Sequence, residues 1–146
     1  MTRLIAGILL ALAIGACGHG AVLAQKKQPP VVLAFALPAG TPGMQQDTSL
    51  DLTVRATSEL PQVKVDLRLP AEISLISGSL SWTGALRAGE ERRLAQRIRV
   101  VRPGDFTLGA SAEILEGPYL GQVAGAVLYI HATPGAVRWS RNPGTF

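Results

Sequence analysis

Arginine is the side chain best suited to bind a ligand in this chain, and five arginines cluster between residues 92 and 102. If this stretch is a β-strand, Arg93, Arg97 and Arg99 project from one face, because side chains alternate between the two faces of a strand. Guanidinium groups bind carboxylates and phosphates through pairs of parallel hydrogen bonds. The three arginines are therefore a candidate surface for anionic lipids, acidic glycans or a partner's carboxylates. The alternative is a solvated sheet face.

Two tryptophans and one cysteine are the other candidates for binding or modification. Trp82, between a serine and a threonine, either anchors a strand in the core or stacks against a sugar ring. Trp139, near the C-terminus, is the second candidate for a glycan contact. Cys17 directly follows an apolar run and is the candidate for lipid attachment.

The residues that enzymes and metal sites need are scarce. Without its first 24 residues the chain has no cysteine and one histidine, His131, which lies in an apolar stretch. No Gly-x-Ser-x-Gly motif marks a nucleophile, and one histidine would need several converging carboxylates to hold a metal. The sequence therefore predicts a protein that is not an enzyme and carries no metal or cofactor. Nucleic acid is not an expected partner, because the arginines have few aromatic residues between them.

The N-terminus has the pattern of an export signal. Residues 4–16 (LIAGILLALAIGA) are uncharged and follow Arg3, and a run of this length is too short to span a bilayer. Val22-Leu23-Ala24 has small residues where signal peptidase reads the chain, which predicts a signal peptide over residues 1–24. Ile14-Gly15-Ala16-Cys17 instead resembles a bacterial lipobox. Cleavage there would leave a lipoprotein signal over 1–16 and a tether over 17–30.

The rest of the chain is patterned like a β-protein. Charged residues make up 16% and hydrophobic residues 47%, which excludes a disordered tail or a coiled coil. Apolar and polar residues alternate over 49–57, 62–69 and 106–114, as in strands with one buried face. Residues 31–37 and 123–132 are apolar at both odd and even positions, which predicts strands covered on both faces or paired inside a sheet. Short strands are expected over 73–76 and 79–83.

The segment 90–102 fits two structures. Leu94, Ile98 and Val101 have helical spacing, but the β-branched residues and the Pro103-Gly104 turn that follows favour a strand. Short strands between glycine and proline turns predict an all-β fold, an Ig-like β-sandwich of about seven strands over residues 31–132. Residues 133–146 lose the alternation, and we expect them to form an extended or disordered tail.

The stretch Leu69–Glu91 carries the most distinctive order of motifs. A strand ends in Leu-Pro, and a Ser-Gly, a Trp-x-Gly and a Gly-Glu turn follow; residues 103–112 then supply a Pro-Gly turn and an alternating strand. In this order the chain resembles the extracytoplasmic Ig-like repeats of bacterial surface proteins and of domains attached to secreted glycosidases. The resemblance covers residues 47–116 and implies a β-sandwich with an accessory, non-catalytic role. It transfers no functional residue, because such domains have no active site.

These observations predict a non-catalytic exported Ig-like module that acts in binding or structure at the bacterial cell envelope. Its expected location is periplasmic or secreted, or lipid-anchored to the membrane through Cys17. The expected partner is an envelope protein or a polysaccharide. The alternative is a glycan-binding accessory domain that works with a separate secreted enzyme.

Overall fold

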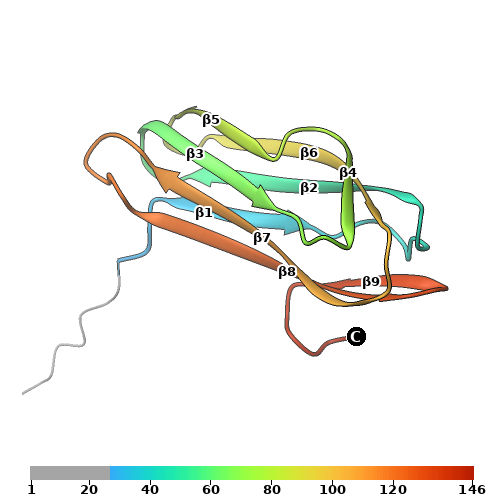
Figure 1. The fold of residues 1–146 in the computed structure, drawn as a ribbon. Helices are drawn as coiled ribbons and strands as arrows, with labels where there is room; N and C mark the ends of the chain where they lie inside the picture. Colours follow the sequence, from blue (N-terminus) through green and yellow to red (C-terminus); the bar gives the residue numbers. More distant parts are fainter. Residues whose placement is uncertain (1–26) are drawn as a thin grey trace, which may run out of the picture.

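The computed structural model describes residues 27–146, so the expected signal segment and Cys17 lie outside the described part. The described residues form nine β-strands and no helix, which confirms the all-β prediction and adds strands to the seven expected (Figure 1). The strands are β1 (Val31–Ala36), β2 (Asp47–Ala56), β3 (Leu60–Arg68), β4 (Ile73–Ser77), β5 (Ser81–Leu86), β6 (Glu91–Val100), β7 (Gly104–Ile114), β8 (Val123–Thr133) and β9 (Ala136–Ser140).

The strands make two antiparallel sheets that pack face to face. One sheet has the order β1-β2-β6-β4 and the other the order β5-β3-β7-β8-β9. In the immunoglobulin fold, strands A, B, E and D share one sheet and C, F and G share the other. The first sheet here has that order, and β3-β7-β8 correspond to C, F and G with one strand added at each edge. The Ig-like β-sandwich that the sequence predicts is therefore confirmed.

The core lies between the sheets and is built from the alternating residues. Leu50, Leu52 and Val54 of β2 are each 0% exposed, as are Leu108 and Ala112 of β7. Their polar neighbours point to the two outer faces, because successive side chains of a strand point in opposite directions. The alternating segments found in the sequence therefore form the inner walls of the sandwich.

Two segments have apolar residues at both odd and even positions, but in the structure one face of each strand is partly exposed. Every second residue of β1 faces the core, but Val32 is 50% exposed. In the first half of β8, Val123 is 56% and Val127 46% exposed. Neither segment is covered on both faces in the described part of the chain. The alternative, pairing inside a sheet, is confirmed for β8, which lies between β7 and β9, and is wrong for β1, which is an edge strand.

The ambiguous segment before residue 103 is a strand. β6 pairs with β2 over nine residues and with β4 on its other side, so a helix there is ruled out. Pro103-Gly104 then reverses the chain between the two sheets. Gly104 has a φ of +139°, a backbone conformation that glycine adopts far more readily than other residues. A glycine therefore suits this position of the turn.

The C-terminal segment is more ordered than the expected tail. β9 pairs with the second half of β8 through the tight turn between Thr133 and Ala136. The Val137 amide donates to the Pro42 carbonyl at 2.9 Å, which ties β9 to the loop between β1 and β2. Arg141 Nε donates to the Phe35 carbonyl at 2.9 Å. The folded unit therefore extends past the predicted boundary at residue 132.

Candidate functional site

The three candidate arginines lie together on the outer face of the four-stranded sheet. β6 carries all three at alternate positions, and the register with β2 places Asp47 directly opposite Arg99. Nη2 of Arg99 lies 2.6 Å from Oδ1 of Asp47, and Nη2 of Arg97 lies 3.9 Å from Oδ2 of the same carboxylate. Arg93 pairs with Asp51, whose hydrogen bond and charge raise the pKa of this guanidinium. Each arginine therefore already faces a carboxylate of the neighbouring strand.

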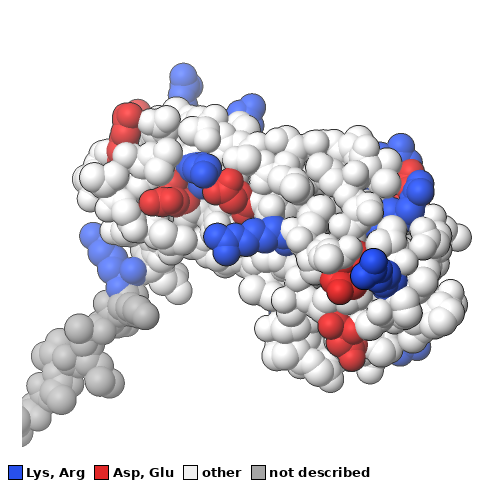
Figure 2. Space-filling view, viewed as in Figure 1, with Lys and Arg blue, Asp and Glu red and all other residues white. Residues whose placement is uncertain are grey.

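This arrangement favours cross-strand pairing over anion binding on that face. An incoming anion would have to compete with Asp47 and Asp51 for the same donors, which lowers its gain on binding. Figure 2 shows a similar mixture elsewhere, with basic and acidic side chains next to one another on the face in view. The structure brings the predicted arginines together but supplies them with partners from the protein itself.

Trp82 is held at the edge of the core rather than displayed as a flat platform. It is half-buried and packs against the core cluster. Its ring lies over Gly84, where an added Cβ would come within 2.5 Å of Trp82 Cζ2. The guanidinium of Arg92, from the other sheet, lies 4.9 Å from the ring centre, at cation–π distance. These contacts support the core-anchor interpretation of Trp82.

Trp139 is also half-buried and packed against the core. It lies on β9 opposite Ile130 of β8. Its ring nitrogen Nε1 is buried and has no hydrogen-bond partner among the described residues. Both tryptophans are therefore partly covered by the core, and Trp139 also lines a concavity with Leu37, Pro38 and Thr41.

A groove that the sequence analysis did not predict lies on the outer face of β7, β8 and β9. We call it the β7–β9 groove; its volume is about 580 Å³. The register puts Asp105, His131 and Arg138 in one row across the three strands. The lining also includes Tyr129 and Phe146, together with Phe106, Thr107, Ile130 and Gly144. A cation, a carboxylate, an imidazole and aromatic rings thus converge on one open concavity.

The polar row of this groove has a defined geometry. His131 Nδ1 lies 2.5 Å from Oδ1 of Asp105, and an ionised carboxylate only accepts hydrogen bonds, so the pair is made by the tautomer with a proton on Nδ1. The Phe146 ring tilts against the imidazole, with 5.6 Å between ring centres and 33° between planes. The Asp105 side chain is 78% exposed, whereas that of His131 is 38% exposed. The imidazole is therefore oriented from two sides, and the carboxylate keeps room for a ligand.

Part of this groove could have been found from the sequence. Two residues, Pro134 and Gly135, separate Thr133 from Ala136, a spacing typical of a tight hairpin. Counting back from that turn puts Arg138 opposite His131. The pairing of His131 with Asp105, 26 positions away, depends on the β7–β8 register and had no local indication.

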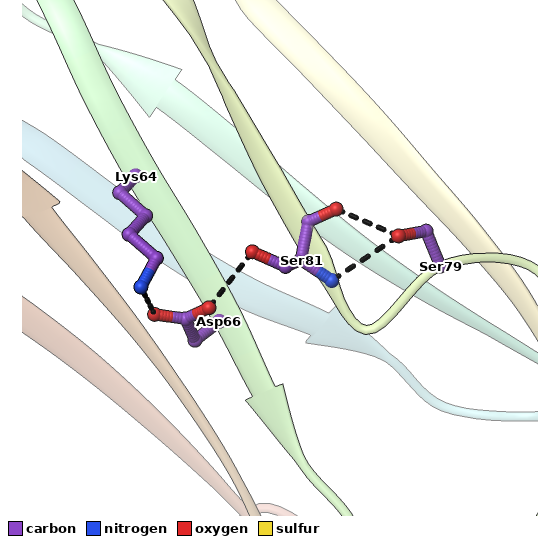
Figure 3. Close-up of polar contacts among 4 residues, drawn as sticks. All are labelled: Lys64, Asp66, Ser79 and Ser81. Atoms are coloured by element: carbon purple, nitrogen blue, oxygen red, sulfur yellow. Dashed lines mark hydrogen bonds and ion pairs between the residues drawn. The ribbon is translucent and has the colours of Figure 1, made fainter.

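A smaller polar cluster joins β3 to the start of β5 (Figure 3). Ser81 Oγ donates to Oδ1 of Asp66 at 2.8 Å, and Lys64 Nζ lies 3.2 Å from Oδ2. Ser79 Oγ donates to the Ser81 carbonyl at 2.7 Å. The hydrogen bond from Ser81 lowers the pKa of Asp66, and Lys64 acts in the same direction. The Ser81 hydroxyl of β5 donates to the Asp66 carboxylate of β3, so the cluster acts as a clamp between the two strands.

This clamp should make stability depend on pH. A lowered folded-state pKa means that ionised Asp66 stabilises the fold above its unfolded-state pKa, and that this contribution is lost as the pH falls through the lowered value. We expect Ser81→Ala to lower the free energy of unfolding by less than about 1 kcal/mol near neutral pH, because the pair is partly exposed. The deficit should fade as the pH is lowered from about 5 to about 2.

Urea unfolding at several pH values measures this difference. Ser49→Ala, at an exposed position of β2, is the matched control and should show no pH-dependent deficit. A Ser81→Ala deficit of the same size at every pH would contradict the role assigned to Asp66.

Comparison with known proteins adds no family to these observations. The chain matches no model of a known protein family, and no curated protein matches it significantly. Within residues 27–146, no helix is long and apolar enough to cross a membrane. The same residues contain no cluster of three or more histidine, cysteine, aspartate or glutamate side chains placed to hold a metal ion.

Proposed function

We propose that this protein is a non-catalytic, exported binding module of the bacterial cell envelope, and that it holds a carboxylate-bearing saccharide in the β7–β9 groove. The observation that carries the proposal is the row of Asp105, His131 and Arg138 beside two aromatic rings in one concavity. Pockets that bind small molecules combine apolar walls with a few converging polar groups, as this one does. Export rests on the N-terminal sequence pattern.

Each wall of the groove suits one part of such a ligand. Arg138 is exposed and can bind a carboxylate with two parallel hydrogen bonds. Asp105 accepts hydrogen bonds from sugar hydroxyls, and His131 offers its second ring nitrogen because the first is engaged with Asp105. The rings of Tyr129 and Phe146 provide apolar surface for the C–H face of a pyranose.

The same residues support binding rather than hydrolysis. Glycosidases commonly use a pair of carboxyl groups on either side of the scissile bond. Asp105 carries the one side-chain carboxylate among the described residues that line the groove, and it is hydrogen-bonded to His131. A binding module of this kind would serve equally as an accessory domain that works with a separate secreted enzyme, since both roles need retention of the glycan and no bond cleavage.

Titration calorimetry with oligogalacturonate, and with a neutral glucose oligomer of equal length, tests the proposal. We expect Arg138→Ser to weaken oligogalacturonate binding by about tenfold or more, the effect of losing a charge-assisted hydrogen-bond pair. Arg68→Ser is the matched control, because Arg68 is exposed on the same outer face but outside the groove. The triple change of Arg93, Arg97 and Arg99 to serine should leave binding intact.

The proposal fails under two results. Equal binding of the acidic and the neutral oligomer by the wild-type protein would show that no cation selects the ligand. Loss of binding in the triple variant but not in Arg138→Ser would show that the saccharide binds to the outer face of the four-stranded sheet instead.

A further inference from the structure

A second feature, separate from the β7–β9 groove, is that β9 covers only half of β8. The β8–β9 pairs run from Tyr129 to Thr133, whereas β8 begins at Val123. In the described part of the chain, no strand pairs with residues 123–128 on this side. The first half of β8 is therefore a sheet edge that lies in line with β9.

The register shows which backbone groups are free along this edge. The Ile114 amide donates to the Gln122 carbonyl at 3.0 Å, which makes the even-numbered residues of β8 the ones bonded to β7. The amides and carbonyls of Val123, Gly125 and Val127 therefore point away from β7. The position of β9 agrees, since it pairs with the same side of β8 farther along.

The edge strand of the other sheet, β1, also has backbone groups that point away from its neighbour, but the residues that carry them are buried. The Thr57 amide donates to the Pro30 carbonyl at 2.8 Å, so the even-numbered residues of β1 bond to β2. Val31, Leu33 and Phe35 then point their backbone groups away from β2. The Phe35 carbonyl confirms this direction, because it accepts its hydrogen bond from the side chain of Arg141.

The two rows border one apolar groove. β1 and the first half of β8 lie side by side (Figure 1). Between them is a concavity of about 380 Å³, whose lining is Gln28, Pro29, Val31, Val32, Leu33, Val123, Ala124 and Gly125. Val32, Val123 and Val127 are exposed apolar side chains beside it. Neither VVLAFA of β1 nor VAGAVL of β8 contains the lysine, proline or bulge that usually protects a sheet edge from another chain.

We propose that this open edge, formed by Val123, Gly125 and Val127 of β8 beside the exposed Val32 of β1, binds an extended segment of a partner polypeptide by strand addition. The partner segment continues the position of β9 and bonds to the free amides and carbonyls of β8. Strand addition draws its affinity from such backbone bonds and its selectivity from pockets for alternate side chains. The segment therefore has uncharged, apolar side chains at every second position, which enter the groove beside β1.

A single extended segment fits this edge better than a second copy of the protein. In an antiparallel pair of two β8 strands centred on Gly125, Tyr129 of one copy would lie opposite Gly121 of the other. Ser140 already occupies the position beside Tyr129, so the end of β9 would collide with the incoming chain. A peptide of about five residues, with a rise of about 3.3 Å each, spans the free part of β8 without meeting β9.

Hydrogen exchange followed by NMR first tests the edge itself. In the protein alone, the amides of Val123, Gly125 and Val127 should exchange at least tenfold faster than those of Ala124 and Ala126, which bond to β7. Equal protection of all five amides would show that the edge is already occupied and would overturn the proposal.

The second step adds a peptide probe, acetyl-KTVTVTVK-amide, whose valines alternate with polar residues. Binding should slow exchange at Val123, Gly125 and Val127 at least tenfold and leave Ala124 and Ala126 unchanged. The control peptide has the same sequence with N-methyl groups on its three threonine amides, the donors that face β8 when the valines enter the groove, and it should give no protection. Protection by both peptides, or by neither, would contradict strand addition.

Two further measurements separate the remaining explanations. Val127→Lys places a charge beside the edge on the exposed face and should weaken peptide binding at least tenfold without affecting saccharide binding. If the same amides become protected with rising protein concentration and no peptide, and sedimentation shows a dimer, a second copy is the occupant and the proposal is wrong. Because the β7–β9 groove shares none of these residues, the result is independent of the saccharide experiment.

Discussion

Replacing Leu52 by alanine should lower the free energy of unfolding by about 2–5 kcal/mol, the range found for deletion of a buried leucine side chain. Leu52 lies in the middle of β2 opposite Leu94 and is 0% exposed. Its neighbours belong to both sheets, so they cannot close the resulting cavity without moving the sheets together. Since domains of this size are stable by only about 5–15 kcal/mol, the loss is a large part of the total.

Urea unfolding of the wild type and of two variants measures this effect. Leu120→Ala is the matched control, because it makes the same chemical change at a side chain that is 67% exposed. The control should stay within about 0.5 kcal/mol of the wild type. Equal losses in the two variants would mean that β2 does not form the inner wall of the sandwich.

Replacing Gly84 by alanine should destabilise the fold by about 1–3 kcal/mol, the usual cost of forcing extra volume into a packed site. The added Cβ would come within 2.5 Å of Cζ2 and 3.1 Å of Cη2 of the Trp82 ring. The indole must then turn away from β5, and it loses its packing against the core as well as its contact with Arg92. The effect is steric, because the φ of Gly84 is not in the left-handed region.

Gly109→Ala provides the contrast in the other part of the same sheet. A Cβ there meets no atom within 4 Å, so the change should be neutral or slightly stabilising. In a Trp139→Phe background, the fluorescence of Trp82 should shift to longer wavelength in Gly84→Ala and remain unchanged in Gly109→Ala. An unshifted spectrum together with wild-type stability in Gly84→Ala would contradict the placement of the indole over β5.

Much of the fold follows from local pattern. The alternation in 49–57, 62–69 and 106–114 identified three strands and their buried faces. A strand with one solvent-exposed and one buried face has polar and apolar residues that alternate with a period of two. The β-branched residues of 90–102 correctly favoured a strand over a helix. The runs at 31–37 and 123–132 did not show that one face of each strand is exposed, since composition does not show whether a neighbouring layer covers the outer face of a strand.

The sequence by itself determined that the chain is an all-β sandwich and which residues of the alternating strands face its core. It also determined that Arg93, Arg97 and Arg99 share one outer face. Only the tertiary structure decided what those arginines contact, because Asp47 and Asp51 reach them through the β2–β6 register. The β7–β9 groove and the open edge of β8 depend in the same way on pairing between distant strands. The physical reason is that side-chain alternation is local, whereas register and sheet edges are set by which strands pair across long separations in the chain.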